Sequence, residues 1–518
     1  MILFYLITLI VFLISYNIYR FYKKLIRSSK VPTINDGFFL FQNQIYRINL
    51  TDLFKQVQII GERTNEVGGL AKFFVGPLLV HVVTTPDDAS TVLSSCMEKM
   101  FVYSMVEPYF GCELIGAPYS IWKTNRRLIN HAFKQNILDG YYDFFNKQAK
   151  RLSDAMSTEI NKESDFRNII SRILLEISCQ TMMGIDVNNK DAITDNYVKA
   201  LNRVIEILVV RFMRPWLMID SIFYWTSLKK EQDQCLKQMW NLSDQLVKLR
   251  KAEHIKRLKN KETDYAEVYK DLKNVDLAIN MYINAYSVYI TENRIKNSLD
   301  ILIEHTVTEE NQILSDLQIR QIIDNILTAG FDTMSSQVLI ILINIGSHPD
   351  VQKKIYEEII GVMGDEDRPI SKTDLGKFTY LDAVLKESIR LYPVGPLVAR
   401  TSTTDVQLTN FVLPANSHIV VHLWGLNRNK NYWGSDADDF RPERWFDDSS
   451  PSQPMTHASF SLGRRNCIGK SYGMTFMKIV VAHIVKKFTI TADEKKLEFE
   501  YALLTKPSRG HLIKIEPR

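Results

Sequence analysis

Residues 460–469 read Phe-Ser-Leu-Gly-Arg-Arg-Asn-Cys-Ile-Gly, and this stretch decides how the rest of the chain is interpreted. Gly463 and Gly469 allow the backbone to approach a flat object, and Cys467 falls at the end of the loop. The residues that follow, 468–487, carry apolar side chains at helical spacing. We therefore expect Cys467 at a helix N-terminus, where unpaired N–H groups and the helix dipole stabilise a thiolate.

A thiolate in this position, with glycines clearing space around it, suits an axial ligand to haem iron. A buried structural cysteine is the alternative interpretation, because a lone cysteine usually packs as a small apolar side chain. The other cysteines form no CxxC pair, and none of the histidines belongs to an HExxH motif. The sequence therefore predicts neither a disulfide framework nor a zinc site.

The composition is that of an ordinary folded protein. The chain has 518 residues, of which 46% are apolar and 24% charged, which excludes a disordered protein. Its 21 glycines and 16 prolines are few for this length and favour long helices over a many-turned sandwich or propeller. No repeat and no Gly/Ser- or Pro-rich linker divides the chain, so we predict one large, mainly helical domain. With a net charge of only +5, we expect no nucleic-acid partner.

The N-terminal stretch has the character of a membrane anchor. Residues 2–19 are apolar or aromatic except for Thr8, Ser15 and Asn17. As a helix they would span about 27 Å, close to the roughly 30 Å hydrocarbon core of a bilayer. Basic residues follow the run and only Met1 precedes it. This asymmetry favours an uncleaved anchor, with the rest of the chain in the cytosol, over a cleaved signal peptide or a buried helix. We see no second run of this kind, and predict an anchor over 1–22, a basic linker over 23–35 and a globular domain over 36–518.

A long helix is predicted over residues 316–345, with Ser315 as its N-cap and Gly-Ser-His-Pro at its end. Its centre, 329–333, reads Ala-Gly-Phe-Asp-Thr. A mid-helix glycine costs about 1 kcal/mol, and the Thr333 hydroxyl can bond a backbone carbonyl. We therefore expect a local bulge or kink there. Such an opening would admit dioxygen and water, with Asp332 and Thr333 side by side to relay protons. A plain helix kink with a solvated Asp332 is the alternative.

Glu387 and Arg390 lie three residues apart in a predicted helix over 380–391 and so share one of its faces. By itself such a pair is commonplace and usually lies on the surface, where it contributes little to stability.

Taken together, these motifs resemble those of the cytochrome P450 family of haem-thiolate monooxygenases. The family's FxxGxRxCxG pattern is matched by Phe460, Gly463, Arg465, Cys467 and Gly469. The resemblance covers essentially the whole chain. It implies a mainly α fold with a small β region, in a single large domain that follows an N-terminal transmembrane helix. It also implies haem b as the cofactor, with Cys467 as the axial ligand of its iron.

The resemblance gives roles to the centre of the long helix. Ala329, Asp332 and Thr333 match the family's oxygen-binding segment, in which the threonine protonates the oxygen that is being activated and the acid connects to water. Met334 stands where the family often has a second hydroxyl side chain. Ala329 stands where many fatty-acid ω-hydroxylases carry a glutamate that esterifies the haem, so this chain cannot form that ester.

Two sets of supporting residues are also implied by the resemblance. Glu387 and Arg390 match the family's ExxR motif and would form a buried network with Arg444, which locks the loop of Cys467 in a structural role. The residues that would hold the haem propionates are Trp122, Arg126, Arg400 and Arg465. For each of these arginines, an ordinary surface position is the alternative.

The implied activity is insertion of one atom of dioxygen into a lipophilic substrate, which would be a fatty acid, hydrocarbon, hormone or xenobiotic. NADPH would supply the electrons through cytochrome P450 reductase, with cytochrome b5 as a further electron-transfer partner. The anchor implies the endoplasmic reticulum membrane, with the catalytic domain facing the cytosol. The alternatives are a haem-thiolate isomerase or dehydratase and a membrane-tethered haem-binding protein without turnover.

Two surfaces are expected to meet partners. Basic residues would surround the thiolate side of the haem and steer an acidic reductase; they are Lys123, Arg126, Arg127, Arg464, Lys470 and Lys478. The aromatic-rich stretch 212–225 would dip into the bilayer interface, with helix core as the alternative. Apolar residues in 105–119, 394–398 and 503–504 would line the substrate pocket, with plain core as the alternative for any single side chain.

Overall fold

The computed structural model describes residues 15–16, 19, 22–23, 25–34, 49–75, 78–184, 191–259, 297–307, 314–447 and 458–518. The predicted membrane anchor, 1–22, lies almost wholly outside them. The chain divides into two compact units. The first unit comprises Met1–Phe101, Gly395–Asp439 and Ser449–Cys467, and the second comprises Val102–Val394, Phe440–Asp448 and Ile468–Arg518.

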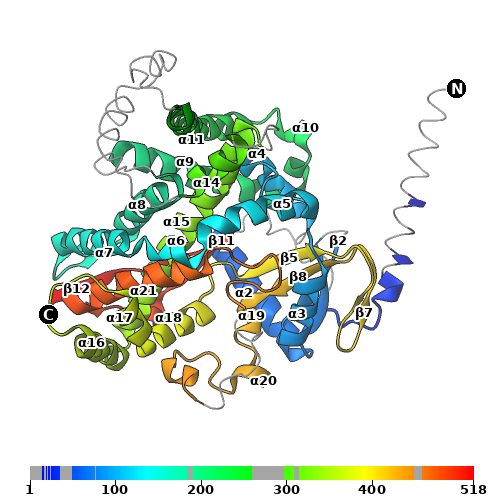
Figure 1. Ribbon diagram of the computed structural model, residues 1–518. Helices are drawn as coiled ribbons and strands as arrows, with labels where there is room; N and C mark the ends of the chain where they lie inside the picture. Colours follow the sequence, from blue (N-terminus) through cyan, green and yellow to red (C-terminus); the bar gives the residue numbers. More distant parts are fainter. Residues whose placement is uncertain are drawn as a thin grey trace. The chain divides into compact units, whose positions relative to one another are not determined.

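The first unit is built on a five-stranded sheet (Figure 1). Its strands, in spatial order, are β1 (Leu70–Val75), β2 (Leu78–Val83), β8 (His418–His422), β5 (Leu397–Thr401) and β3 (Glu98–Lys99). β2 and β8 are parallel, and the other neighbours are antiparallel. The valine-rich sequences of β2 and β8 fit a strand that is buried between neighbours. A two-stranded ribbon and four helices complete the described part of the unit: β6 (Val406–Gln407), β7 (Val412–Leu413), α2 (Leu50–Glu66), α3 (Pro86–Ser95), α19 (Leu423–Leu426) and α20 (Lys430–Trp433).

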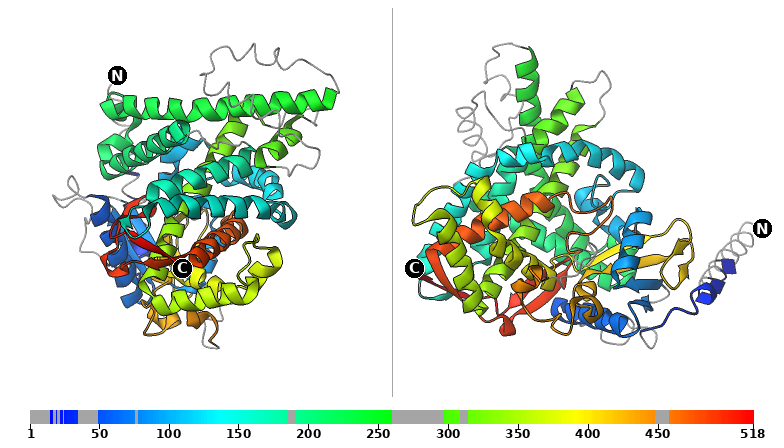
Figure 2. Two further views of the ribbon diagram at one scale, coloured as in Figure 1. Left: turned by 90° about the vertical axis from the view of Figure 1, so that its left-hand side faces the viewer. Right: turned by 60° about the horizontal axis from the view of Figure 1, so that its bottom comes forward.

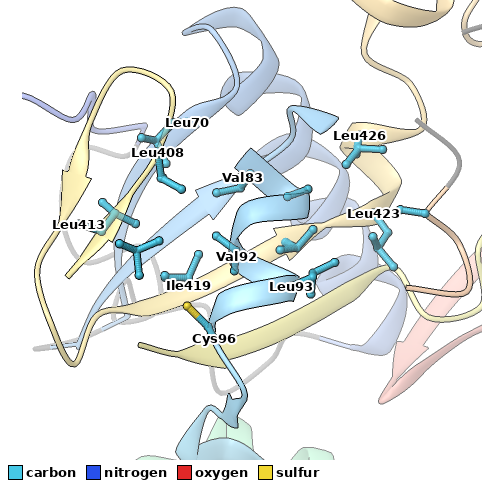
Figure 3. Packing of buried hydrophobic residues seen from close by; sticks show 14 of the residues in the cluster. Leu70, Val83, Val92, Leu93, Cys96, Leu408, Leu413, Ile419, Leu423 and Leu426 are labelled. Carbon is cyan, nitrogen blue, oxygen red and sulfur yellow. The ribbon is translucent and has the colours of Figure 1, made fainter. Parts of the chain in front are cut away.

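One apolar cluster holds this sheet to α3 (Figure 3). Val92 and Leu93 of α3 and the adjoining Cys96 face Val83 and Ile419 of the strands. All of these side chains are at most 3% exposed, so each contributes close to the full free energy of burial, about 1.5–3 kcal/mol for a side chain of this size.

Residues 25–34, within the predicted basic linker, pack onto the edge of this sheet. Ser28 and Ile34 are buried, and Thr33 pairs with Lys72 of β1. The Lys72 ammonium group donates to the Ser28 carbonyl oxygen (2.6 Å). The chain between the predicted anchor and the domain is therefore part of the first unit's folded structure.

The second unit is mainly helical. Its helices are α4 (Glu107–Phe110), α5 (Tyr119–Ile129), α6 (Gln135–Asp139), α7 (Tyr142–Met156), α8 (Arg167–Ser178), α9 (Asp191–Met213), α10 (Asp220–Phe223), α11 (Ser227–Lys259), α14 (Ser298–Val307), α15 (Asp316–Ser347), α16 (Pro349–Met363), α17 (Lys372–Lys377), α18 (Thr379–Leu391) and α21 (Lys470–Lys487). α11 runs beside α9 and is the long green helix in the left-hand view of Figure 2. Small sheets complete the unit; their strands are β4 (Glu163–Ser164), β9 (Phe488–Thr491), β10 (Glu498–Ala502), β11 (Leu504–Arg509) and β12 (Ile513–Pro517). The predicted fold class, mainly α with a small β region, is confirmed.

α15 is the core helix of the second unit. Ser315 caps it as predicted, because its hydroxyl accepts from the Gln318 N–H while the Gln318 side chain accepts from the Ser315 N–H. The helix is long and apolar enough to cross a membrane, and is the only such helix among the residues described. However, 83% of its most apolar window is buried inside the protein, so it is a core helix. The expectation of no second long apolar run was therefore wrong, because a helix packed on all sides needs the same composition as a membrane span.

His422 joins three elements of the first unit through its imidazole ring. Its Nε2 donates to the Val57 carbonyl oxygen of α2 (2.8 Å), and its Nδ1 accepts from the Gly425 N–H of α19 (2.9 Å). Only the neutral ring can make both bonds. Burial lowers the pKa of His422 to about 4.

This geometry predicts a loss of stability in acid. An unfolded histidine protonates near pH 6.5 whereas His422 resists protonation until about pH 4, so this contribution is complete above pH 6.5 and declines as the pH falls towards 4. The decline is up to about 3 kcal/mol. Urea unfolding between pH 7.5 and 4.5 measures it. His422→Gln should flatten this part of the pH dependence, and a variant with the wild-type slope would contradict the assignment.

Candidate active site

The loop that carries Cys467 is closed by its own backbone. The Cys467 N–H donates to the Phe460 carbonyl oxygen (2.9 Å), and the Asn466 N–H donates to the Gly463 carbonyl oxygen (3.3 Å). The Cys467 side chain is exposed. α21 begins at Lys470 with Gly469 as its N-cap, so the helix starts two residues later than the sequence predicts.

Gly463 is required for a reason that the sequence did not indicate. Its φ of +70° lies in the left-handed region, and an added Cβ would overlap the carbonyl oxygen of Leu93 at the end of α3. Within the first unit, Gly463 therefore fits the Cys467 loop against α3, in addition to any approach to a flat ligand.

Three positive side chains gather in the first unit. Arg400 of β5 and Arg465 of the Cys467 loop are both buried. Lys99 of β3 is the cross-strand partner of Arg400. Burial, followed by the positive charges of Arg400 and Arg465, lowers the pKa of Lys99 well below its ordinary value. The structure thus brings two predicted residues together and adds Lys99, which sequence reasoning missed because strand pairing set its position.

The centre of α15 is a short exposed window in a buried helix. From residue 322 to residue 346, every side chain is buried except those of Ala329, Gly330 and Thr333. The Thr333 hydroxyl donates to the Ala329 carbonyl oxygen (2.6 Å), as the sequence predicts. Of the predicted bulge or kink, the bulge is wrong, because α15 is α-helical throughout these residues, and the kink stays a prediction. The helix accommodates Gly330 next to Ser178 of α8 without a change of helix type.

The Asp332 side chain has a cation as its neighbour. Its carboxylate is buried, and its Oδ1 pairs with the Lys506 ammonium group of β11 at 2.6 Å. Asp332 and Thr333 are successive residues, about 100° apart around the helix, so they do not share a face. Lys506 is a second residue that sequence reasoning missed, because it belongs to a strand far along the chain.

Glu387, Arg390 and Arg444 meet as predicted. The Glu387 carboxylate accepts from Arg390 at 2.9 and 2.8 Å and from Arg444 Nε at 2.8 Å. The three side chains are at most 3% exposed. The Trp445 indole N–H adds a fourth bond to the same carboxylate (3.1 Å). One carboxylate therefore joins α18 to the segment 440–448 within the second unit.

A family model described as Cytochrome P450 matches residues 43–514. The chain belongs to the cytochrome P450 family.

The most similar relatives support the same assignment. This P450 is 29% identical to cytochrome P450 4V2 of Homo sapiens over 456 residues, which cover 87% of this chain and 82% of the relative. Cytochrome P450 4V2 of Mus musculus is 26% identical over 495 residues, which cover 94% of this chain and 90% of the relative. Cytochrome P450 4d2 of Drosophila melanogaster is 26% identical over 469 residues, with 89% of each chain covered. The chain is therefore a monooxygenase of the oxidoreductase class.

Membership of the P450 family implies haem, and the residues of the first unit fit this cofactor. Haem b carries two propionate groups, and the first unit offers two buried guanidinium groups, those of Arg400 and Arg465, close to Lys99. Arginine suits this task because its planar fork matches a carboxylate. The exposed Cys467 side chain follows Arg465 by two residues and can supply the sulfur ligand.

Two further predicted haem-binding residues of this P450 belong to the second unit. Trp122 and Arg126 lie one turn apart on α5, and the Arg126 guanidinium carbon is 6.0 Å from the centre of the Trp122 ring. Trp122 is buried and Arg126 partly exposed. Arg126 also donates to the Asn130 side chain (2.9 Å).

The Glu387 network predicts a large effect of a small change. Glu387→Gln removes the carboxylate charge that two buried guanidinium groups share, so the free energy of unfolding should fall by about 3–5 kcal/mol. Urea unfolding checks this value. Glu357→Gln is the matched control, because Glu357 pairs with Lys353 on the surface at 3.8 Å and should change stability by less than about 0.5 kcal/mol. If the two variants lose similar stability, the network does not hold the unit together.

Proposed function

We propose that this P450 inserts one oxygen atom into a lipophilic substrate, with electrons that NADPH supplies through a flavoprotein reductase. The balanced reaction is RH + O₂ + 2e⁻ + 2H⁺ → ROH + H₂O. The observation that carries the proposal is the exposed window of α15, where Thr333 offers a partly exposed hydroxyl group in a stretch of helix that is otherwise buried. An isomerase or dehydratase, which consumes no NADPH, would not need this proton-donating side chain.

Haem b supplies the activation of dioxygen when it is bound. In our proposal Cys467 binds it as a thiolate, and Trp122, Arg126, Arg400 and Arg465 hold its propionates. The buried positions of Arg400 and Arg465 favour this role over the alternative of surface arginines.

Protons reach the reacting oxygen through Thr333 in this proposal. The Thr333 hydroxyl is partly exposed and anchored on the Ala329 carbonyl oxygen, which fixes its position. Asp332, the neighbouring acid, takes up protons from water and passes them on.

The substrate is proposed to be a fatty acid, hydrocarbon, hormone or xenobiotic of low polarity. This rests on the resemblance to the clan that includes fatty-acid ω-hydroxylases and on the apolar residues 394–398. Ala329 excludes an ester bond between haem and the glutamate that many of those enzymes carry at this position.

The proposed electron donor is an acidic cytochrome P450 reductase, with cytochrome b5 as a second donor. Lys123 and Arg127 are exposed on α5 and support a basic docking surface. Lys478 is less suited to it than the sequence suggested, because it is only 14% exposed and pairs with Asp382 at 2.7 Å.

The proposed location is the endoplasmic reticulum membrane, with residues 1–22 as a single-pass anchor. Residues 212–225 support contact with lipid rather than the alternative of helix core. Six of their apolar side chains are exposed: Phe212, Trp216, Ile219, Ile222, Tyr224 and Trp225. The buried Arg211 stacks on Phe223 and pairs with Asp220, which holds this segment in place.

NADPH consumption with reconstituted reductase, on a panel of fatty acids and hydrocarbons, tests the proposal. Mass spectrometry should detect a product heavier by one oxygen atom. Product formation without NADPH would instead indicate an isomerase or dehydratase, and a haem-loaded protein that turns over nothing would indicate a haem-binding protein.

Cys467→Ser should abolish the absorption spectrum that is typical of a thiolate-bound, reduced carbon monoxide complex, because an alcohol oxygen cannot replace the sulfur ligand. Difference spectroscopy measures the loss. Cys235→Ser is the matched control, since Cys235 lies on α11 in a partly exposed position and should leave the spectrum intact. A normal spectrum from Cys467→Ser would overturn the assignment of the ligand.

Thr333→Ala should keep that spectrum but divert electrons into hydrogen peroxide, because the proton donor is lost. The measured quantity is hydrogen peroxide released per NADPH consumed, which should rise severalfold. Thr333→Ser keeps the hydroxyl group and should stay near the wild-type value. Full coupling in Thr333→Ala would show that Thr333 is not part of the relay.

A further inference from the structure

The ion pair between Lys506 and Asp332 joins a strand to the centre of α15. The Lys506 ammonium nitrogen lies 2.6 Å from Asp332 Oδ1, and the two side chains are 19% and 7% exposed. Lys506 also donates to the side-chain oxygen of Asn202 on α9 (3.3 Å). One cation thus connects α9, α15 and β11 within the second unit.

Burial makes this cation necessary for the charge of Asp332. A carboxylate that is nearly excluded from water is strongly destabilised unless a countercharge lies next to it. Glu500 is the cross-strand partner of Lys506. Burial raises the pKa of Glu500 above its ordinary value, and the positive charge of Lys506 partly opposes this rise. Arg167 and Glu206 act on Glu500 as well. Among the described residues, Lys506 is the cation in contact with the Asp332 carboxylate.

The two oxygens of Asp332 have different surroundings. Oδ1 is held by Lys506, whereas Oδ2 is buried and has no hydrogen-bond partner among the described residues. A buried carboxylate oxygen of this kind is normally satisfied by an ordered water molecule. Asp332 and Thr333 point to different sides of α15, so a proton must pass between them through water or after a rotation of Asp332.

We propose that Lys506 is the positioning residue of the proton relay. It holds Oδ1 of Asp332 and leaves Oδ2 to water, which supplies the protons that Thr333 delivers. In this role Lys506 acts through Asp332 alone. This inference rests on the proposed relay through Asp332 and Thr333.

The test compares Lys506→Met, Lys506→Arg, Asp332→Asn and the double variant Lys506→Met/Asp332→Asn. The full-length, haem-loaded protein is reconstituted with reductase, with dodecanoate as the probe. The readout is hydrogen peroxide released per NADPH consumed, between pH 6 and pH 9. Loss of the neighbouring cation disfavours a charge on the buried Asp332 carboxylate, so the pH midpoint of coupling in Lys506→Met should move upward. Lys506→Arg should keep the wild-type midpoint.

Two controls separate positioning from a general structural role. Lys514 lies on β12, where its ammonium nitrogen is 2.9 Å from the Glu516 carboxylate and its side chain is 37% exposed. Lys514→Met should therefore not move the pH midpoint of coupling. In the Asp332→Asn background, Lys506→Met should have no further effect on coupling, because its only route of action is gone.

Thermal unfolding supplies a readout that is independent of turnover. In Lys506→Met the buried Asp332 carboxylate lacks its cation, so a charge at this position destabilises the folded protein. The unfolding temperature should therefore fall further below that of the wild type as the pH rises. The double variant, which has no carboxylate at this position, should lose this dependence.

Each outcome bears on a different statement. Suppose that Asp332→Asn uncouples the enzyme but Lys506→Met keeps the wild-type pH midpoint. The role of Lys506 is then refuted and the relay stands. The same conclusion follows if Lys506→Met uncouples the wild-type protein and the Asp332→Asn variant to the same extent. If Asp332→Asn stays fully coupled, the relay through Asp332 is refuted, and the role of Lys506 with it. If Lys506→Met only lowers the unfolding temperature by the same amount at every pH, Lys506 is a structural residue.

Discussion

The buried carboxylate of Glu387 is the constraint on which the second unit most depends. It accepts bonds from two guanidinium groups and one indole, and these donors come from two segments that are distant in sequence. Two positive charges against one negative charge would be unfavourable in an apolar interior if any donor were misplaced. The arrangement therefore tolerates few alternative packings. It anchors residues 440–448, from which the chain leads in sequence to the Cys467 loop.

Both units place cations in buried surroundings. In the second unit, Arg390 and Arg444 share the Glu387 carboxylate, and Lys506 pairs with Asp332. In the first unit, burial, followed by the positive charges of Arg400 and Arg465, lowers the pKa of Lys99. Buried arginines grouped in this way suit the binding of an anionic cofactor.

Local features were predictable from the sequence, and long-range partners were not. The capping box at Ser315, the bond from Thr333 to the Ala329 carbonyl oxygen and the contact of Glu387 with Arg390 all depend on residues at most four positions apart. Lys99 and Lys506 escaped notice because strand pairing and sheet packing bring them to their partners. The predicted bulge at Gly330 is absent for a related reason. Glycine lowers helix propensity, but packing of α15 against α8 and other helices of the unit keeps the regular helix in place.

The packing of α15 also explains why its polar residues divide into two sets. A helix surrounded by other elements can expose only a narrow face, and here that face consists of Ala329, Gly330 and Thr333. Asp332 lies on the adjacent, buried face, where a charge persists only beside a cation. The acid and the alcohol are thus neighbours in sequence but occupy different environments, one buried and ion-paired, the other partly exposed. This separation allows Lys506 to hold the Asp332 carboxylate while the Thr333 hydroxyl group faces the reacting molecules.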